Sequence, residues 1–150
     1  MLSIRIVCVG KLKERFYADA ANEYIKRLAG YCRLEVVEVP EHRVSADNKE
    51  ALSVRGKIPA GALVIALCVD GRDLDSPGLA GLLSDCAGRG TSKLCFIIGG
   101  SFGLHDDIIS IADVKLSLSK MTFPHNLARI ILLEQLYRAF KIIEGGKYHK

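Results

Sequence analysis

Short apolar runs alternate along the chain with longer segments in which apolar residues recur every three or four positions. The runs are rich in β-branched residues and predict five strands, at residues 4–9, 34–39, 63–69, 94–98 and 114–118. The longer segments predict helices at residues 16–28, 76–88, 106–111 and 124–144. Strands that are apolar throughout and alternate with helices predict an α/β fold with a parallel sheet covered on both faces.

Two segments depart from this pattern. Residues 34–39 alternate apolar side chains with Glu, which is typical of a half-exposed or edge strand. Residues 41–60 are polar, and Ser45 is placed to cap a short helix that includes Leu52 and Val54. A mobile loop is the alternative for this segment.

The length and composition favour one domain without a membrane anchor. The 150 residues, of which 49% are hydrophobic, suit a single domain over residues 1–150 whose core needs no disulfide or metal. No apolar run reaches the ~18 residues of a membrane span, and the first residues lack the order of a signal peptide. We therefore expect a cytoplasmic protein with no membrane partner.

Cationic residues gather near both ends of the chain. The net charge is +4, with six Lys or Arg residues from Lys11 to Arg33 and four more from Arg138 onward. If the fold brings the two ends together, they form one basic patch suited to a polyanion such as RNA. A solvated surface without a partner explains the charge alone equally well.

The five cysteines have the pattern of buried thiols. Cys8, Cys68 and Cys95 lie within apolar runs, Cys86 shares a helix face with leucines, and no pair has C-x-x-C spacing. Such thiols act as small hydrophobic groups. The four histidines have no metal-ligand spacing either, so we expect no metal site.

Candidate ligand-binding segments follow the predicted strands, because parallel sheets bind ligands at the carboxyl ends of their strands. These segments are residues 70–73, 99–103 and 118–125. The glycines of residues 99–103 allow a flat ligand to approach the backbone closely, although a plain tight turn also explains them. They do not form a dinucleotide or phosphate-loop fingerprint, which argues against a dinucleotide-dependent dehydrogenase.

Two segments combine side chains that suit a nucleotide or RNA. Residues 118–125 mix apolar and small hydroxyl side chains, which could wrap an adenine ring or a methyl group, or could pack beneath the last helix. The final Tyr148-His149-Lys150 combines an aromatic ring with cationic groups, which suits stacking on an unpaired base and a phosphate contact. A frayed tail is the alternative.

Five motifs occur in order over the whole chain. They are Gly10-Lys11-Leu12-Lys13-Glu14, Ile98-Gly99-Gly100-x-x-Gly103, Leu118 to His125, Leu133-Glu134-Gln135-Leu136-Tyr137-Arg138-Ala139, and Tyr148-His149-Lys150. Together they resemble the small SPOUT-class methyltransferases that act on large-subunit ribosomal RNA, the 23S rRNA (pseudouridine-N3)-methyltransferase family. Each motif is weak alone, but five in this order are specific.

The resemblance implies a three-layer parallel-sheet SPOUT fold with a trefoil knot in its C-terminal half, which nothing in the composition or periodicity indicates. It also implies a homodimer, with S-adenosyl-L-methionine held largely by main-chain contacts. The cofactor contacts carried over by position are Leu67, Gly99, Leu118, Ser119, Lys120, Met121, Thr122 and Phe123. The family often has an acidic residue where Cys68 stands here, so a side-chain role at that position is in doubt.

The implied reaction is methylation of N3 of a pseudouridine in 23S rRNA, in the large subunit or the assembled ribosome, with no role for DNA. A sulfonium makes the methyl group electrophilic, so the protein must align the ring nitrogen and let its proton leave. We predict that His149 accepts this proton and that Tyr148 positions the base. We predict that Arg138 and Lys150 contact RNA phosphates, the alternative for Arg138 being a salt bridge to Glu134.

Two other functions stay open from the sequence. One is methylation of another RNA, such as tRNA. The other is a non-enzymatic RNA-binding module, which would bind no S-adenosylmethionine. The motifs at the two ends of the chain favour the ribosomal substrate.

Overall fold

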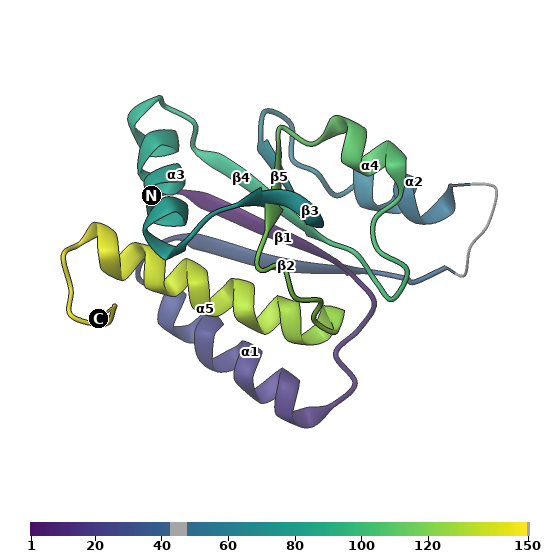
Figure 1. Ribbon diagram of the computed structural model, residues 1–150, viewed down its shortest axis with the longest axis horizontal. Helices are drawn as coiled ribbons and strands as arrows, with labels where there is room; N and C mark the ends of the chain where they lie inside the picture. Colours follow the sequence, from purple (N-terminus) through teal and green to yellow (C-terminus); the bar gives the residue numbers. More distant parts are fainter. Residues whose placement is uncertain (43–47, 150) are drawn as a thin grey trace.

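A five-stranded parallel sheet forms the middle layer of the protein (Figure 1). The computed structural model describes residues 1–42 and 48–149. The strands are β1 (Ser3–Val9), β2 (Arg33–Val39), β3 (Leu63–Asp73), β4 (Lys93–Ile98) and β5 (Val114–Ser117). They lie in the order β2-β1-β4-β3-β5, and every neighbouring pair is parallel. The five predicted strands and their parallel arrangement are confirmed.

Helices cover both faces of the sheet, giving three layers (Figure 1). One face packs against α1 (Arg15–Leu28), α3 (Ser76–Gly88) and α5 (His125–Ile143), and the other against α2 (Lys49–Arg55) and α4 (Asp106–Ile111). The predicted α/β fold with two covered faces is therefore confirmed. Within the described ranges, no helix combines the length and apolarity needed to cross a membrane.

Side-chain alternation explains why the inner strands are apolar throughout. In β4, Phe96 packs toward the layer that contains α5, while Cys95 and Ile97 pack toward the layer that contains α2 and α4. All three side chains are fully buried. Since successive side chains of a strand point to opposite faces, a strand in the middle of a three-layer fold has no polar face.

The two edge strands differ from the inner ones. β2 pairs only with β1, and its burial alternates, with Glu35 exposed between the half-buried Leu34 and Val36. The prediction of an edge strand at residues 34–39 is confirmed. β5 is the opposite edge and has only four residues.

β3 extends further than its apolar run predicts. We expected the strand to end at Val69 and residues 70–73 to form a loop, but the strand continues to Asp73. Its register on β5 shifts between Leu67 and Arg72, both of which face Leu116. A Cβ on Gly71 would lie 2.9 Å from the carbonyl carbon of Leu116, so only glycine lets β3 pass this close to the β5 backbone. The hydrophobic pattern does not predict this polar extension, because the extension is defined by backbone pairing with β5 and not by apolar side chains.

The polar segment before β3 contains the expected short helix. α2 begins after Asn48, which has a left-handed backbone (φ 54) and donates through Nδ2 to Asp107 at the start of α4. Because residues 49–55 are helical, the loop alternative is wrong for them. The predicted cap, Ser45, lies outside the described residues.

Candidate functional site

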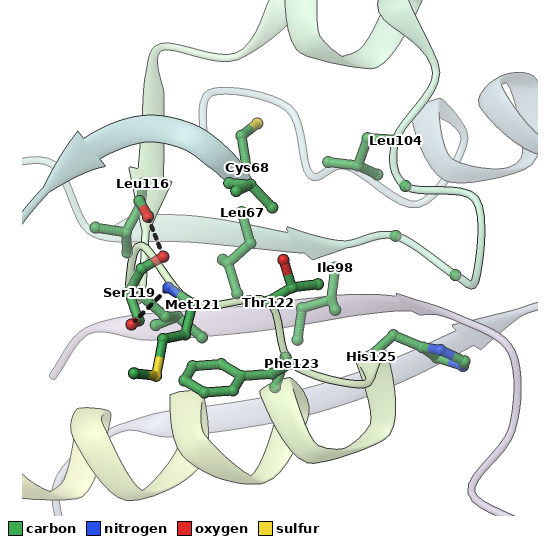
Figure 2. A pocket seen from close by; sticks show the side chains of 17 residues that line it. Leu67, Cys68, Ile98, Leu104, Leu116, Ser119, Met121, Thr122, Phe123 and His125 are labelled. Carbon is green, nitrogen blue, oxygen red and sulfur yellow. Dashed lines mark hydrogen bonds between the residues drawn. The ribbon is translucent and has the colours of Figure 1, made fainter.

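The middle of β3 and the segments at the ends of β4 and β5 enclose an apolar pocket of about 140 Å³ at the carboxyl edge of the sheet (Figure 2). Its described lining contains no Asp, Glu, Lys or Arg, and its only imidazole belongs to His125. A pocket of this kind suits a flat, largely uncharged group held by van der Waals contact and backbone hydrogen bonds. Its lining residues are Leu67, Cys68, Val69, Ile98, Gly99, Gly100, Gly103, Leu104, Leu116, Ser117, Leu118, Ser119, Met121, Thr122, Phe123, His125 and Ala128.

The glycine cluster after β4 forms one wall of the pocket. The N–H of Gly103 donates to the carbonyl of Gly100 at 3.1 Å, and Gly103 has a left-handed backbone (φ 77). A Cβ on Gly99 would lie 2.6 Å from the carbonyl carbon of Gly103, closer than real Cβ atoms approach. The segment is thus a tight turn, as one interpretation predicted, and the same turn brings bare backbone to the pocket wall.

Hydroxyl groups fix the loop after β5. The Ser117 hydroxyl donates to the carbonyl of Ser119 at 2.9 Å, and the N–H of Met121 donates to the Ser119 hydroxyl at 3.0 Å (Figure 2). These local bonds replace the ladder bonds that the backbone loses where β5 ends. The loop holds its apolar side chains at the pocket, and Met121 is 76% exposed. When a ligand covers an exposed methionine beside an apolar pocket, apolar surface is removed from water, which stabilises the complex.

The structure brings together all but one of the residues predicted to contact a cofactor. Lys120 is the exception, since it lines a separate groove with Asp73 and Asp75. The others line the pocket and are Leu67, Gly99, Leu118, Ser119, Met121, Thr122 and Phe123.

Several other lining residues were not predicted as cofactor contacts. Ile98 is the last residue of β4 and belongs to the glycine motif, Leu104 follows the glycine turn, and Ala128 lies on the first turn of α5. The signal that could have identified Ile98 as a contact is its place at the end of a strand that leads into Gly99. Leu104 and Ala128 are ordinary apolar residues with no such signal.

Cys68 is the one cysteine that is not buried as predicted. It is half-buried at the pocket, whereas the other four thiols lie in the core. Burial, together with the nearby Asp70 carboxylate, raises the pKa of the Cys68 thiol. The expectation of burial for Cys8, Cys68, Cys86 and Cys95 is wrong only at Cys68, because residues 68–71 lie at the register shift, where β3 is more exposed. Among the described residues, no group of His, Cys, Asp or Glu has a metal-binding arrangement.

The C-terminal tail folds back on the end of α5. The Tyr148 ring meets Tyr137 edge-on at 4.9 Å between centroids, and the Arg138 guanidinium lies 4.8 Å from the Tyr148 ring centre. Burial and the Glu134 carboxylate raise the pKa of Tyr148. The described part of the tail is therefore packed, and the frayed alternative is wrong for Tyr148. Lys150 lies outside the described residues.

Arg138 is held by several partners. Its Nη2 lies 2.6 Å from Glu134, which is the salt bridge that we considered as the alternative to a phosphate contact. Its Nη1 lies 3.1 Å from Nδ1 of His149. Because a guanidinium can only donate, the lone pair of His149 Nδ1 accepts this hydrogen bond. Any proton acceptance at His149 Nδ1 requires this contact to open.

The tail and the start of α5 lie at opposite ends of that helix (Figure 1). His125, which lines the pocket, begins this helix of 19 residues, and His149 follows its end. At a rise of ~1.5 Å per residue the helix is roughly 28 Å long. Within one chain the structure therefore does not bring His149, Tyr148 or Arg138 to the predicted cofactor residues.

The two basic segments meet only in part. α1 packs beside α5, and the guanidinium of Arg27 lies 5.2 Å from the ring centre of Tyr24 and 5.7 Å from that of Tyr137. Lys26 is exposed on the same end of α1. The condition for one basic patch is therefore met only by the carboxyl end of α1, because Lys11 and Lys13 lie near His125 at the opposite end of α5.

Both the sequence and the fold of the chain are similar to those of known proteins. A family model described as "Predicted SPOUT methyltransferase" matches residues 2–149. The chain is similar to Ribosomal RNA large subunit methyltransferase H of Clostridioides difficile (strain 630), with 46% identity over 99% of this chain and 100% of that protein.

Two solved structures share the fold. The first is a probable methylase family protein from Haemophilus influenzae Rd KW20, with a TM-score of 0.62 and 15% identity over 100% of this chain and 72% of that one. The second is the SpoU methyltransferase AviRb from Streptomyces viridochromogenes in complex with the cofactor AdoMet, with a TM-score of 0.52 and 12% identity over 97% of this chain and 59% of that one.

Proposed function

The chain belongs to the SPOUT methyltransferase family, and we propose that it transfers a methyl group from S-adenosylmethionine to N3 of a pseudouridine in 23S ribosomal RNA. The observation that carries the proposal is the apolar pocket at the carboxyl edge of the sheet, in a chain whose full-length relatives are named ribosomal RNA methyltransferases. A ribosomal substrate implies action in the cytoplasm.

The apolar, uncharged lining of the pocket suits the adenine ring of this cofactor. Gly99 permits the tight turn that forms one wall, because a Cβ there would meet the Gly103 backbone, and the Leu67 and Ile98 side chains supply apolar contact. Bound there, the sulfonium supplies an electrophilic methyl group. Neutral lining residues suit a step in which the protein contributes alignment and exclusion of water more than a nucleophile. The protein reported with AdoMet shares this fold.

The active form is a homodimer in this proposal, with the trefoil knot that the family implies. A homodimer also gives the tail a role. Since α5 separates His149 from the pocket of its own chain, the His149 that accepts the N3 proton belongs to the other subunit. Tyr148 positions the base there, and Arg138 and Lys150 contact phosphates. Reaching the base requires the His149 ring to leave Arg138.

The proposal is tested by calorimetry with S-adenosylmethionine and by methyl transfer to purified ribosomes. We expect saturable binding of the cofactor and transfer to one modified base in 23S rRNA. Mapping base methylation in ribosomes from a strain that lacks the protein identifies the position. No heat with the cofactor would instead indicate a non-enzymatic RNA-binding module, and transfer to tRNA but not to ribosomes would reassign the substrate.

A further inference from the structure

A second cleft lies next to the pocket and is much more polar. We call it the outer cleft, and its volume is about 640 Å³, which is in the range of small-ligand sites. It is formed by the segments after β1, β2 and β4 and by the start of α5. The side chains that define it are Lys11, Lys13, Glu41, Phe102, His125 and Asn126.

His125 connects the two cavities, because it lines both. Figure 2 shows its imidazole turned away from Leu67 and Phe123. On the outer side, a Cβ placed on Gly10 would lie 3.7 Å from His125 Nε2 and 3.7 Å from Glu41 Oε2. The imidazole therefore faces the outer cleft, and a group bound in that cleft lies next to whatever occupies the pocket.

The outer cleft presents an aromatic ring and two cations. Phe102 is 70% exposed, which is unusual for a large apolar side chain with no ring partner among the described residues. Lys11 and Lys13 are exposed, and within residues 1–42 and 48–149 neither makes a salt bridge. An exposed ring beside free ammonium groups is the combination that binds an unstacked base and its phosphate.

The cleft also offers hydrogen-bond acceptors, which a site for a simple anion would avoid. Glu41 accepts the N–H of Ser101 at 2.8 Å through Oε1, and its Oε2, like His125 Nε2, lies 3.7 Å from the place a Cβ on Gly10 would take. The Asn126 side chain lines the same cleft. A pyrimidine edge carries N–H donors, and its nucleotide carries the phosphate, so a nucleotide complements both the acceptors and the lysines.

We propose that the outer cleft receives the target nucleotide of the RNA, turned out of its stack. The base packs on Phe102, the adjoining phosphates meet Lys11 and Lys13, and an N–H edge of the base faces His125 at the boundary of the pocket. This inference rests on the proposed methyl transfer and adds the site at which the acceptor base binds. Flipping a base out of its stack is the usual solution when chemistry must reach one of its atoms.

Phe102→Ala, Phe102→Tyr and a Lys11→Gln/Lys13→Gln double variant test the site, because all three side chains are exposed and their loss leaves the core intact. Lys93→Gln is the control, since Lys93 is an exposed lysine at the amino end of β4, on the opposite edge of the sheet. Two quantities are measured for each: the Kd of S-adenosylmethionine, and kcat and KM for methylation of ribosomes.

We expect Phe102→Ala to lower kcat/KM for ribosomes by about tenfold or more, the usual scale for loss of one base–aromatic contact, with the cofactor Kd unchanged. Phe102→Tyr keeps the ring and should restore most of that loss. The double lysine variant should raise KM and flatten its salt dependence, and Lys93→Gln should do neither.

Wild-type kcat/KM in both Phe102→Ala and the double lysine variant would overturn the inference while leaving the proposed function in place. Weakened cofactor binding in the same variants would assign the outer cleft to the cofactor and would also overturn it. A wild-type protein that binds no S-adenosylmethionine and methylates no ribosome would remove the proposed function itself, and the inference with it.

Discussion

Arg129 on α5 reaches across to β2 and donates through Nη1 to Glu38 at 2.7 Å. Its Nη2 donates to the carbonyl of Gly10 at 3.1 Å, and the N–H of Leu12 donates to the same Glu38 oxygen at 3.2 Å. Arg129 is 4% exposed, so its charge depends on these partners for compensation. The pair therefore ties the turn after β1, which carries Lys11 and Lys13, to the first part of α5.

Glu38→Ala should destabilise the protein by about 2–4 kcal/mol, because it leaves the buried Arg129 charge without its carboxylate. The lower part of this range is expected, since the Glu38 side chain is 35% exposed. Glu35→Ala is the matched control on the same strand: Glu35 pairs with Arg5 at 2.8 Å but is 60% exposed, and its loss should cost less than about 1 kcal/mol. Urea unfolding measures both values, and equal losses would contradict the role given to Arg129.

Gly99→Ala should weaken S-adenosylmethionine binding at least tenfold and destabilise the fold by about 1–3 kcal/mol, since its Cβ would meet the Gly103 backbone at 2.6 Å. Gly30→Ala is the control, because nothing lies within 4 Å of a Cβ there. Calorimetry and thermal unfolding of both variants check the prediction. Cofactor affinity unchanged in Gly99→Ala would show that the glycine turn is not part of the cofactor site.

Cys68 should be the cysteine that reacts with a thiol reagent in the native protein. It is half-buried, while Cys8, Cys32, Cys86 and Cys95 are buried. Saturating S-adenosylmethionine should slow the reaction, because Cys68 lines the pocket. The measurement is the rate of 5,5′-dithiobis(2-nitrobenzoate) modification with and without cofactor, with Cys68→Ser as the control. Rapid modification that persists in Cys68→Ser would disprove the assignment.

Stability should fall at alkaline pH through the buried thiols. Burial raises the pKa of Cys8 from 9.0 to about 12, the nearby Arg129 charge offsetting only part of the effect. The unfolded thiol ionises first, so this stabilisation is complete below pH 9 and is lost as the pH rises from 9 toward 12. The slope is on the order of 1 kcal/mol per pH unit for one such thiol. Urea unfolding of wild type and Cys8→Ala at pH 8 and pH 10.5 should show a smaller loss in the variant.

Removal of residues 148–150 should abolish methylation of ribosomes and leave the cofactor Kd unchanged. The tail packs on Tyr137 and Arg138 at the far end of α5, so its loss does not touch the pocket. Calorimetry and a ribosome methylation assay on the truncated protein check both halves. Full activity without the tail would place the RNA-binding face elsewhere.

Much of the fold could be predicted, because a strand that is buried on both faces has a continuous run of apolar residues in the sequence. The runs around Ile6, Ile65 and Phe96 mark the three inner strands, and Pro124 with Gly145 bounds the last helix within a residue. The polar end of β3 could not be predicted in this way. Its pairing depends on the close approach of Gly71 to the β5 backbone, which is a property of the tertiary structure.

The predicted site residues were those that follow a strand or belong to a family motif, and the other residues of the site were not predicted. Residues after β4 and β5 were found because ligands bind where parallel strands end. The separation of His149 from the pocket could also have been predicted, because the helix expected at residues 124–144 begins beside the candidate segment 118–125 and places the tail at its far end. The outer cleft was missed because it combines Lys11, Glu41 and Phe102, which are far apart in sequence and individually unremarkable.

The pocket is completed by residues 116–128, which are synthesised late. The edge strand β2 and its neighbour β1 can pair once Val39 has left the ribosome, but Met121, Phe123 and Ala128 are still untranslated at that point. A nascent or prematurely terminated chain that ends at β4 carries most of the sheet but lacks the part of the pocket formed by residues 116–128. Under the proposed function, such a chain should not bind S-adenosylmethionine, and incomplete chains should not compete with the finished enzyme for it.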